Sequence, residues 1–255
     1  MLKYLEKIRR KSMYEKIKDF QLAILGVCIA LGAIFAALVA TNNLSNNNIQ
    51  VTGSAYEIVK SDSANWTLTI TAKEPTRLQA YKTVQKQIPE VKKYLVSKGI
   101  QENQIELLLS NSYETYKTNQ NTGYGTNIVD KYVYQQPIKI STTDVEKVKE
   151  LSTEYQVLFE KGINVASSGD PQYHYSKLAD LKVSLLEKAT KDAKNRAKSM
   201  LKSNHNRVGK IRSAKMGVFQ ITPVDSNDVS DSGYNDLSSI EKKVTAVANV
   251  SFAIK

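Results

Sequence analysis

The sequence is poor in the residues that most often build catalytic and metal sites. It contains one cysteine, Cys28, and two histidines, His174 and His205. A single cysteine excludes an internal disulfide framework and a thiolate metal cluster, so stability must come from an ordinary hydrophobic core. The two histidines lack the paired spacing of a metal site. No G-x-S-x-G motif accompanies them, so nothing indicates a Ser/His/Asp triad.

Motifs for phosphate, dinucleotide and nucleic-acid binding are also missing. The acidic pair Glu146 and Glu150 lies beside Lys147 and Lys149, away from the apolar stripe of its predicted helix, which is typical of a solvated face. No spacing points to the carboxylate pair of a glycoside hydrolase. We therefore predict a protein that is not an enzyme, with no cofactor, no metal and no nucleic-acid partner.

One long hydrophobic run is present, at residues 20–40, and seven basic residues against three acidic ones precede it. As a helix it would be about 31 Å long, close to the ~30 Å hydrocarbon core of a bilayer. The run is longer than the apolar part of a cleaved signal peptide and has no A-x-A-like site near its end. Because basic flanks stay in the cytoplasm, we predict a single-pass signal anchor in the cytoplasmic (inner) membrane.

This assignment divides the chain into four segments. Residues 1–19 are a basic cytoplasmic leader, 20–40 the transmembrane anchor and 41–48 a polar tether; 49–255 form one periplasmic or extracellular domain. The leader has apolar residues at roughly helical spacing. It is either an amphipathic helix on anionic lipid or a plain juxtamembrane basic segment. The net charge of +11 is spread among interspersed acids, which favours a solvated surface.

The outer domain alternates strand and helix patterns. They predict the order β-β-α-β-β-α-β-α-β-β, an α+β fold with a mostly antiparallel sheet and helices packed on one face. The predicted strands are 50–60, 64–73, 104–117, 128–141, 163–175, 208–222 and 244–254; the predicted helices are 75–98, 145–160 and 176–203. Pro89 should kink or divide the first helix, and the 163–175 strand should be interrupted at 169–171.

The helix at 176–203 has alanine at every fourth position, Ala189, Ala193 and Ala197. Small side chains there allow a close approach to a flat neighbour, so we predict a helix packed tightly on a sheet. Gly53, inside a strand pattern, indicates a bulge or a close backbone approach. The predicted buried arc consists of Leu178, Leu185, Leu186, Ala189, Ala193, Ala197 and Met200.

The strands at 104–117 and 128–141 should form a long hairpin that is rich in tyrosine over residues 111–136. Its candidate interaction residues are Tyr113, Tyr116, Tyr124, Tyr132 and Tyr134. Tyrosine among Asn, Gln, Thr and Gly is typical of binding surfaces. Three interpretations stay open: the tyrosines contact another subunit, they stack on an external ligand such as a glycan, or cross-strand pairs merely stabilise the hairpin.

Four stretches together resemble the SIMPL-domain family of bacterial periplasmic and envelope proteins. They are VTGSA at 51–55, SKGIQENQI at 97–105, ATKDAKNRAKSM at 189–200 followed by VGKI at 208–211, and VTAVANVSFAI at 244–254. One departure is SNHNR at 203–207, where family members usually have a glycine-containing turn; Asn204 or Asn206 could adopt the left-handed conformation instead.

The resemblance implies an envelope-associated, non-enzymatic protein that can self-assemble, and some relatives are linked to stress tolerance. It brings no shared biochemical activity. We therefore expect a membrane-anchored, homo-oligomeric structural or stress-related protein. The alternative is a binding module that recognises a cell-wall glycan or an envelope protein through the hairpin at 111–136.

Overall fold

The computed structural model describes residues 20–21, 23–39, 47–119 and 123–255. Residues 20–21 and 23–39 are helical. Within these ranges, none of the helices combines the length and the hydropathy that crossing a bilayer requires. The predicted leader, most of the predicted tether, and Leu22 and Ala40 of the predicted anchor lie outside the described residues. The anchor therefore stays a prediction.

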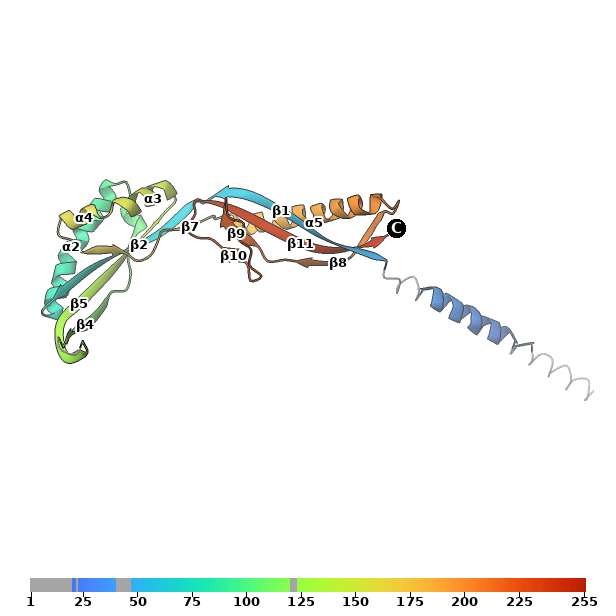
Figure 1. The fold of residues 1–255 in the computed structure, drawn as a ribbon, viewed down its shortest axis with the longest axis horizontal. Coiled ribbons are helices and arrows are strands. Elements are labelled where there is room, and N and C mark those ends of the chain that lie inside the picture. Colours follow the sequence, from blue (N-terminus) through green and yellow to red (C-terminus); the bar gives the residue numbers. More distant parts are fainter. Residues whose placement is uncertain (1–19, 22, 40–46, 120–122) are drawn as a thin grey trace, which may run out of the picture. The chain divides into compact units, whose positions relative to one another are not determined.

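The strands of residues 47–255 form two sheets, and the prediction of one sheet is wrong (Figure 1). β1 (Asn48–Lys60) pairs with β11 (Glu241–Ile254) in the first sheet. β11 also pairs with β8 (Val208–Met216) and, antiparallel, with β9 (Gln220–Pro223). β10 (Tyr234–Asn235) joins β9 in parallel, so this sheet is mixed. The α+β class is confirmed.

The second sheet is built around β2 (Ser63–Glu74) and β5 (Gly125–Thr142), which pair antiparallel from Ala64↔Thr142 to Glu74↔Tyr132. β3 (Ile105–Leu107) and β4 (Asn111–Thr118) both pair with β5. β6 (Val165–Ser167) and β7 (Gln172–His174) both pair with β2, and residues 169–171 interrupt them as predicted.

The connection between β1 and β2 explains why these strands do not form a hairpin. The backbone N–H of Ser61 donates to Ile240 O at 2.8 Å, and that of Asp62 donates to His174 O at 2.9 Å. The Asp62 carboxylate accepts bonds from the N–H and the hydroxyl of Ser176. Because partners distant in sequence satisfy these groups, the chain runs on from one sheet into the other.

Helices α2 (Arg77–Ser97) and α3 (Val145–Glu154) cover one face of the second sheet, as predicted for the helices of this fold. α2 runs through Pro89 without dividing, and Gly99 ends it with a φ of +96°. The predicted helix at 145–160 is two helices, α3 and α4 (Val157–Glu160). The core between these helices and the sheet includes Trp66, Leu68, Ile70, Val84, Val91, Ile138, Ile140, Val148 and Leu151.

Helix α5 (Leu178–Lys202) packs closely on the first sheet. A Cβ on Gly53 of β1 would lie 2.8 Å from Ala193 Cα and still closer to Ala189 O and Ala193 N. The predicted close approach of backbones is thus confirmed, and only glycine fits there. β11 is paired on both sides, and it buries every second residue from Val244 to Phe252, so one of its faces is covered.

The buried row of α5 differs from the predicted arc. Leu178 and Leu186 are partly exposed and Met200 is 57% exposed, so their placement in the core was wrong. A row of every fourth residue is inclined to the helix axis, and a twisted sheet can follow that incline over several turns. The buried residues are Leu181, Leu185, Ala189, Ala193, Ala197 and Leu201.

The turn after α5 also corrects a prediction. His205 has a φ of 57°, and neither Asn204 nor Asn206 has a positive φ. The Asn206 N–H donates to Leu201 O at 3.2 Å, a bond that closes the helix end around a left-handed residue. That geometry places the left-handed position at His205.

Two predicted strands are broken. The strand at 104–117 stops at residues 108–110, where the side-chain amide of Gln136 donates to Leu108 O at 2.6 Å. This bond takes the carbonyl out of regular pairing and leaves Leu109 93% exposed. The strand at 208–222 separates into β8 and β9 around Gly217, whose N–H donates to Val247 O.

Candidate functional site

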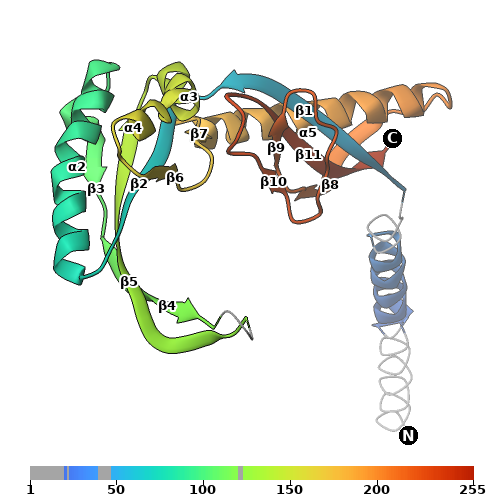
Figure 2. The same cartoon turned by 60° about the vertical axis from the view of Figure 1, so that its left-hand side comes forward.

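β4 and the first half of β5 form a two-stranded extension of the second sheet, called the tyrosine ribbon (residues 111–136, of which 120–122 lie outside the description). β2 pairs with β5 only from Tyr132 onward, so the ribbon continues past β2 (Figure 2). Register shifts follow Thr115 and Tyr116, which confines regular pairing to residues 111–115 of β4. The predicted hairpin is therefore present, and its end extends beyond the sheet.

One face of the ribbon is bound to α2. Tyr134 packs edge-on against Tyr81 of α2, with ring centroids 5.5 Å apart, and its hydroxyl donates to Ser110 Oγ. Arg77 of α2 lies over the ring of Tyr132 at 5.4 Å. These contacts support the structural interpretation for Tyr132 and Tyr134, because both rings fasten the ribbon to a helix.

Arg77 also forms a 2.6 Å ion pair with Glu114 of β4, and the hydroxyl of Tyr116 donates to the same carboxylate. The Arg77 hydrogen bond, followed by that of Tyr116, holds the pKa of Glu114 below its usual range. The Glu114 hydrogen bond in turn raises the pKa of Tyr116. The ribbon is thus held against α2 at Tyr132, Tyr134 and Glu114, which contact Arg77 or Tyr81.

Alanine substitution should separate the bound tyrosines from the free ones. We expect Tyr134→Ala to lower the free energy of unfolding by about 2 kcal/mol, because it removes the Tyr81 ring contact and a hydrogen bond. Tyr124, 77% exposed, is the matched control, and Tyr124→Ala should change stability by less than about 0.5 kcal/mol. Urea unfolding followed by the fluorescence of Trp66, the single tryptophan, measures both. Equal losses of unfolding free energy in the two variants would contradict the distinction between bound and free tyrosines.

The other side of the ribbon is open. Among the described strands, β5 alone pairs with β3 and with β4, so both present a free edge. β3, β4 and residues 108–110 between them are called the open edge. Large apolar side chains are exposed along it, namely Leu107, Leu109, Tyr113 and Tyr116. Tyr124 and Ile128 are also exposed, at the end of the ribbon.

A family model matches residues 49–252, and its description is SIMPL, a protein of unknown function (DUF541). The chain belongs to the SIMPL family. No curated protein matches the chain. In the SIMPL domain, Gly53 of the VTGSA stretch lies against Ala189 and Ala193 of the alanine-rich helix. Two of the stretches that carry the sequence similarity therefore meet where the backbones of β1 and α5 approach closely.

Sequence reasoning missed a buried ion pair. Lys242 of β11 and Asp236 are 3% and 5% exposed, and Lys242 Nζ lies 2.7 Å from Asp236 O and 3.6 Å from Asp236 Oδ2. Burial lowers the pKa of Lys242 against the opposing effect of Asp236. Burial would raise the pKa of Asp236, but hydrogen bonds from Ser238 and Ser239 together with Lys242 hold it below its ordinary value.

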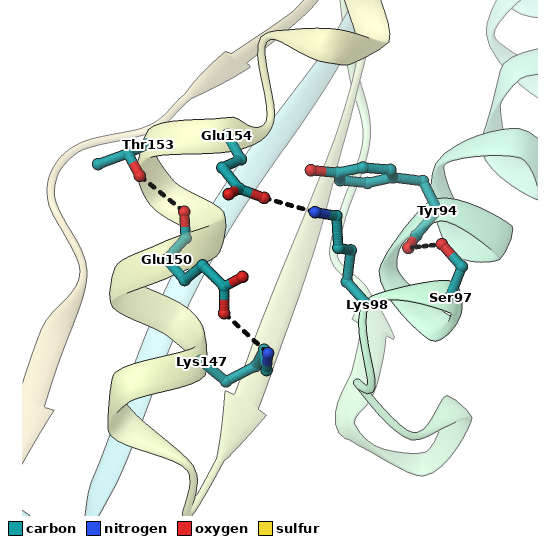
Figure 3. Close-up of polar contacts among 7 residues, drawn as sticks. All are labelled: Tyr94, Ser97, Lys98, Lys147, Glu150, Thr153 and Glu154. Carbon is teal, nitrogen blue, oxygen red and sulfur yellow. Dashed lines mark hydrogen bonds and ion pairs between the residues drawn. The ribbon is translucent and has the colours of Figure 1, made fainter.

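Figure 3 shows the polar contacts along α3 and at the end of α2, and its ion pairs involve partly exposed side chains. Lys98 pairs with Glu154, and Lys147 pairs with Glu150 at 2.8 Å. Glu146 pairs with Lys60 at 2.9 Å. Glu146 and Glu150 are exposed, as predicted for a solvated face. The hydroxyl of Tyr94 is buried without a described partner, and burial raises its pKa.

The two histidines are not brought together. His174 lies in β7, with its Nε2 atom buried and unpaired among the described residues, and His205 lies in the turn after α5. Within the described ranges, no three His, Cys, Asp or Glu side chains are grouped as a metal ion would require.

Proposed function

We propose that this SIMPL protein is a non-enzymatic structural protein, anchored in the cytoplasmic membrane, whose outer domain assembles with further copies of itself. The anchor and the outward orientation rest on the apolar run at 20–40 and its basic flank. The assembly rests on the open edge, where unpaired strand groups coincide with exposed leucine and tyrosine side chains. Soluble proteins usually cover or charge such an edge, because it can pair with another chain.

A second copy is the partner that this geometry favours. An antiparallel strand pair is self-complementary about a two-fold axis, so the same edge can serve both subunits. The contacts of Arg77 and Tyr81 fix the ribbon in one orientation, which lowers the entropy lost when the edge is joined. A two-fold antiparallel pairing of residues 111–115 would place Tyr113 of each copy opposite Tyr113 of the other, with Leu109 just beyond the paired residues.

Light scattering after size exclusion tests the proposal on residues 47–255, which contain both sheets. We expect a defined multimer for the natural sequence and a smaller species for Leu109→Lys, because a lysine at the open edge opposes strand pairing. Val229→Lys is the matched control, since Val229 is also an exposed apolar residue, at 81%, but lies in the loop before β10. A monomer in all three proteins would refute assembly.

The alternative function is recognition of a cell-wall glycan or an envelope protein by the tyrosine ribbon. Tyr113, Tyr116 and Tyr124 are the exposed tyrosines of the ribbon, since the rings of Tyr132 and Tyr134 contact Arg77 and Tyr81. If the natural sequence is a monomer, titration with purified peptidoglycan tests this function. Saturable binding that Tyr124→Ala weakens would support it.

A further inference from the structure

A cleft lies where β1 ends and β7 begins. It has a volume of about 590 Å³, within the ~300–1,000 Å³ range of small-molecule sites. Backbone bonds hold its walls together: Ser61 N–H donates to Ile240 O and Tyr173 N–H to Leu237 O, both at 2.8 Å. The charged and aromatic side chains that line it are Lys60, Glu146, Lys149, Asp170, Tyr173 and Glu241, and this site is called the junction cleft.

Tyr173 supplies an unused polar group to this cleft. Its side chain is buried, with 5% of the residue exposed, and none of the described residues forms a hydrogen bond with its hydroxyl. Tyr173 lines the cleft together with Glu146 and Asp170. Burial raises the pKa of Tyr173, and these two carboxylates raise it further. A phenol that has no protein partner is available to form a hydrogen bond with a ligand.

The charges around Tyr173 are mixed. Lys60 and Glu146 form a 2.9 Å pair, in which both side chains are more than half exposed, and Glu241 also raises the pKa of Lys60. Lys149 and Asp170 line the same cleft. An exposed ion pair is weak and exchanges readily. Two cations beside three carboxylates match neither a polyanion nor a polycation, and they complement a ligand that carries both charges within a few ångströms.

We propose that the junction cleft binds short zwitterionic peptides. The ligand carboxylate pairs with Lys60 and Lys149, and the ligand ammonium pairs with Glu146, Asp170 and Glu241. The Tyr173 hydroxyl forms a hydrogen bond with the peptide group between them. This site lies on different residues from the open edge, so it does not depend on assembly of the protein.

Saturation-transfer NMR on the full chain in detergent micelles tests the proposal with three dipeptides: dialanine, alanyl-lysine and alanyl-glutamate. We expect saturable transfer to at least one of them, with a dissociation constant of about 1 mM. N-acetyl-dialanine amide has the same backbone but neither charge, and it should bind at least about tenfold more weakly. No transfer from any dipeptide at about 5 mM, or equal binding of the uncharged analogue, would overturn the proposal.

Variants locate the binding. Tyr173→Phe keeps the ring and removes the hydroxyl, so it should weaken dipeptide binding by about threefold to tenfold. Lys149→Met should weaken binding of dialanine without changing binding of its C-terminal amide. Tyr124→Phe, the same change at the end of the tyrosine ribbon, is the control and should leave binding unaltered. If Tyr173→Phe and Tyr124→Phe bind the dipeptides with equal affinity, the binding site is not the junction cleft.

Discussion

Replacing Gly53 with alanine is expected to lower the free energy of unfolding by about 4 kcal/mol or to prevent folding. The added Cβ would lie 2.8 Å from Ala193 Cα and closer still to two further backbone atoms of α5. A side chain could move aside, but a helix backbone cannot move without separating the whole buried row from β1. Urea unfolding of the natural and substituted domains measures the difference.

Two controls make this test specific. A Cβ on Gly125 meets nothing within 4 Å, and Gly125 has no positive φ, so Gly125→Ala should change stability by less than about 1 kcal/mol. Adding Ala193→Gly to Gly53→Ala should not restore stability, since the contacted atoms of Ala193 belong to its backbone. A stable Gly53→Ala domain would show that α5 and β1 are farther apart than described.

Replacing Asp236 with asparagine should have the next largest effect, a loss of about 3–5 kcal/mol at neutral pH. The change leaves Lys242, 3% exposed, as a buried charge whose carboxylate is gone. Because the cost comes from the unpaired charge, the double substitution Asp236→Asn with Lys242→Met should recover most of the stability. A double variant as unstable as Asp236→Asn would contradict this cause.

The same pair predicts a dependence on pH. The pKa of Asp236 is lower in the folded protein than its ordinary value of 3.8, so between those two values the unfolded state binds more protons. Its stabilising contribution is therefore present above about pH 4 and is lost as the pH falls through the folded-state pKa. The stability gap between natural and Asp236→Asn domains should narrow below about pH 4. A gap that widens there would contradict the sign.

Local periodicity predicted the positions of the strands and helices better than it predicted which strands pair. The alternation in β2 and β11 and the alanines of α5 each report the burial of one face, which adjacent residues determine. The division into two sheets depends on bonds from Ser61 to Ile240 and from Asp62 to His174, which link residues far apart in sequence. Alternation within one strand does not indicate partners so distant in sequence.

The candidate site shows the same limit. Composition identified the tyrosine ribbon, but only its pairing with β5 and its contact with α2 separate Tyr132 and Tyr134 from Tyr113 and Tyr124. The burial of Lys242 and Asp236 was not predicted, because nothing in the neighbouring sequence distinguishes a buried charge from an exposed one. Leu109 follows the alternation of a buried strand, yet the Gln136 amide breaks that strand and exposes it.

Hydrogen exchange of the β4 amides tests self-assembly through the open edge most directly. In residues 47–255, the amides of Asn111–Thr115 that face away from β5 should exchange slowly when the protein is concentrated and quickly when it is dilute, because a second copy protects them. Leu109→Lys should abolish that dependence, and Val229→Lys should preserve it. Rapid exchange of these amides at every concentration would contradict assembly through this edge.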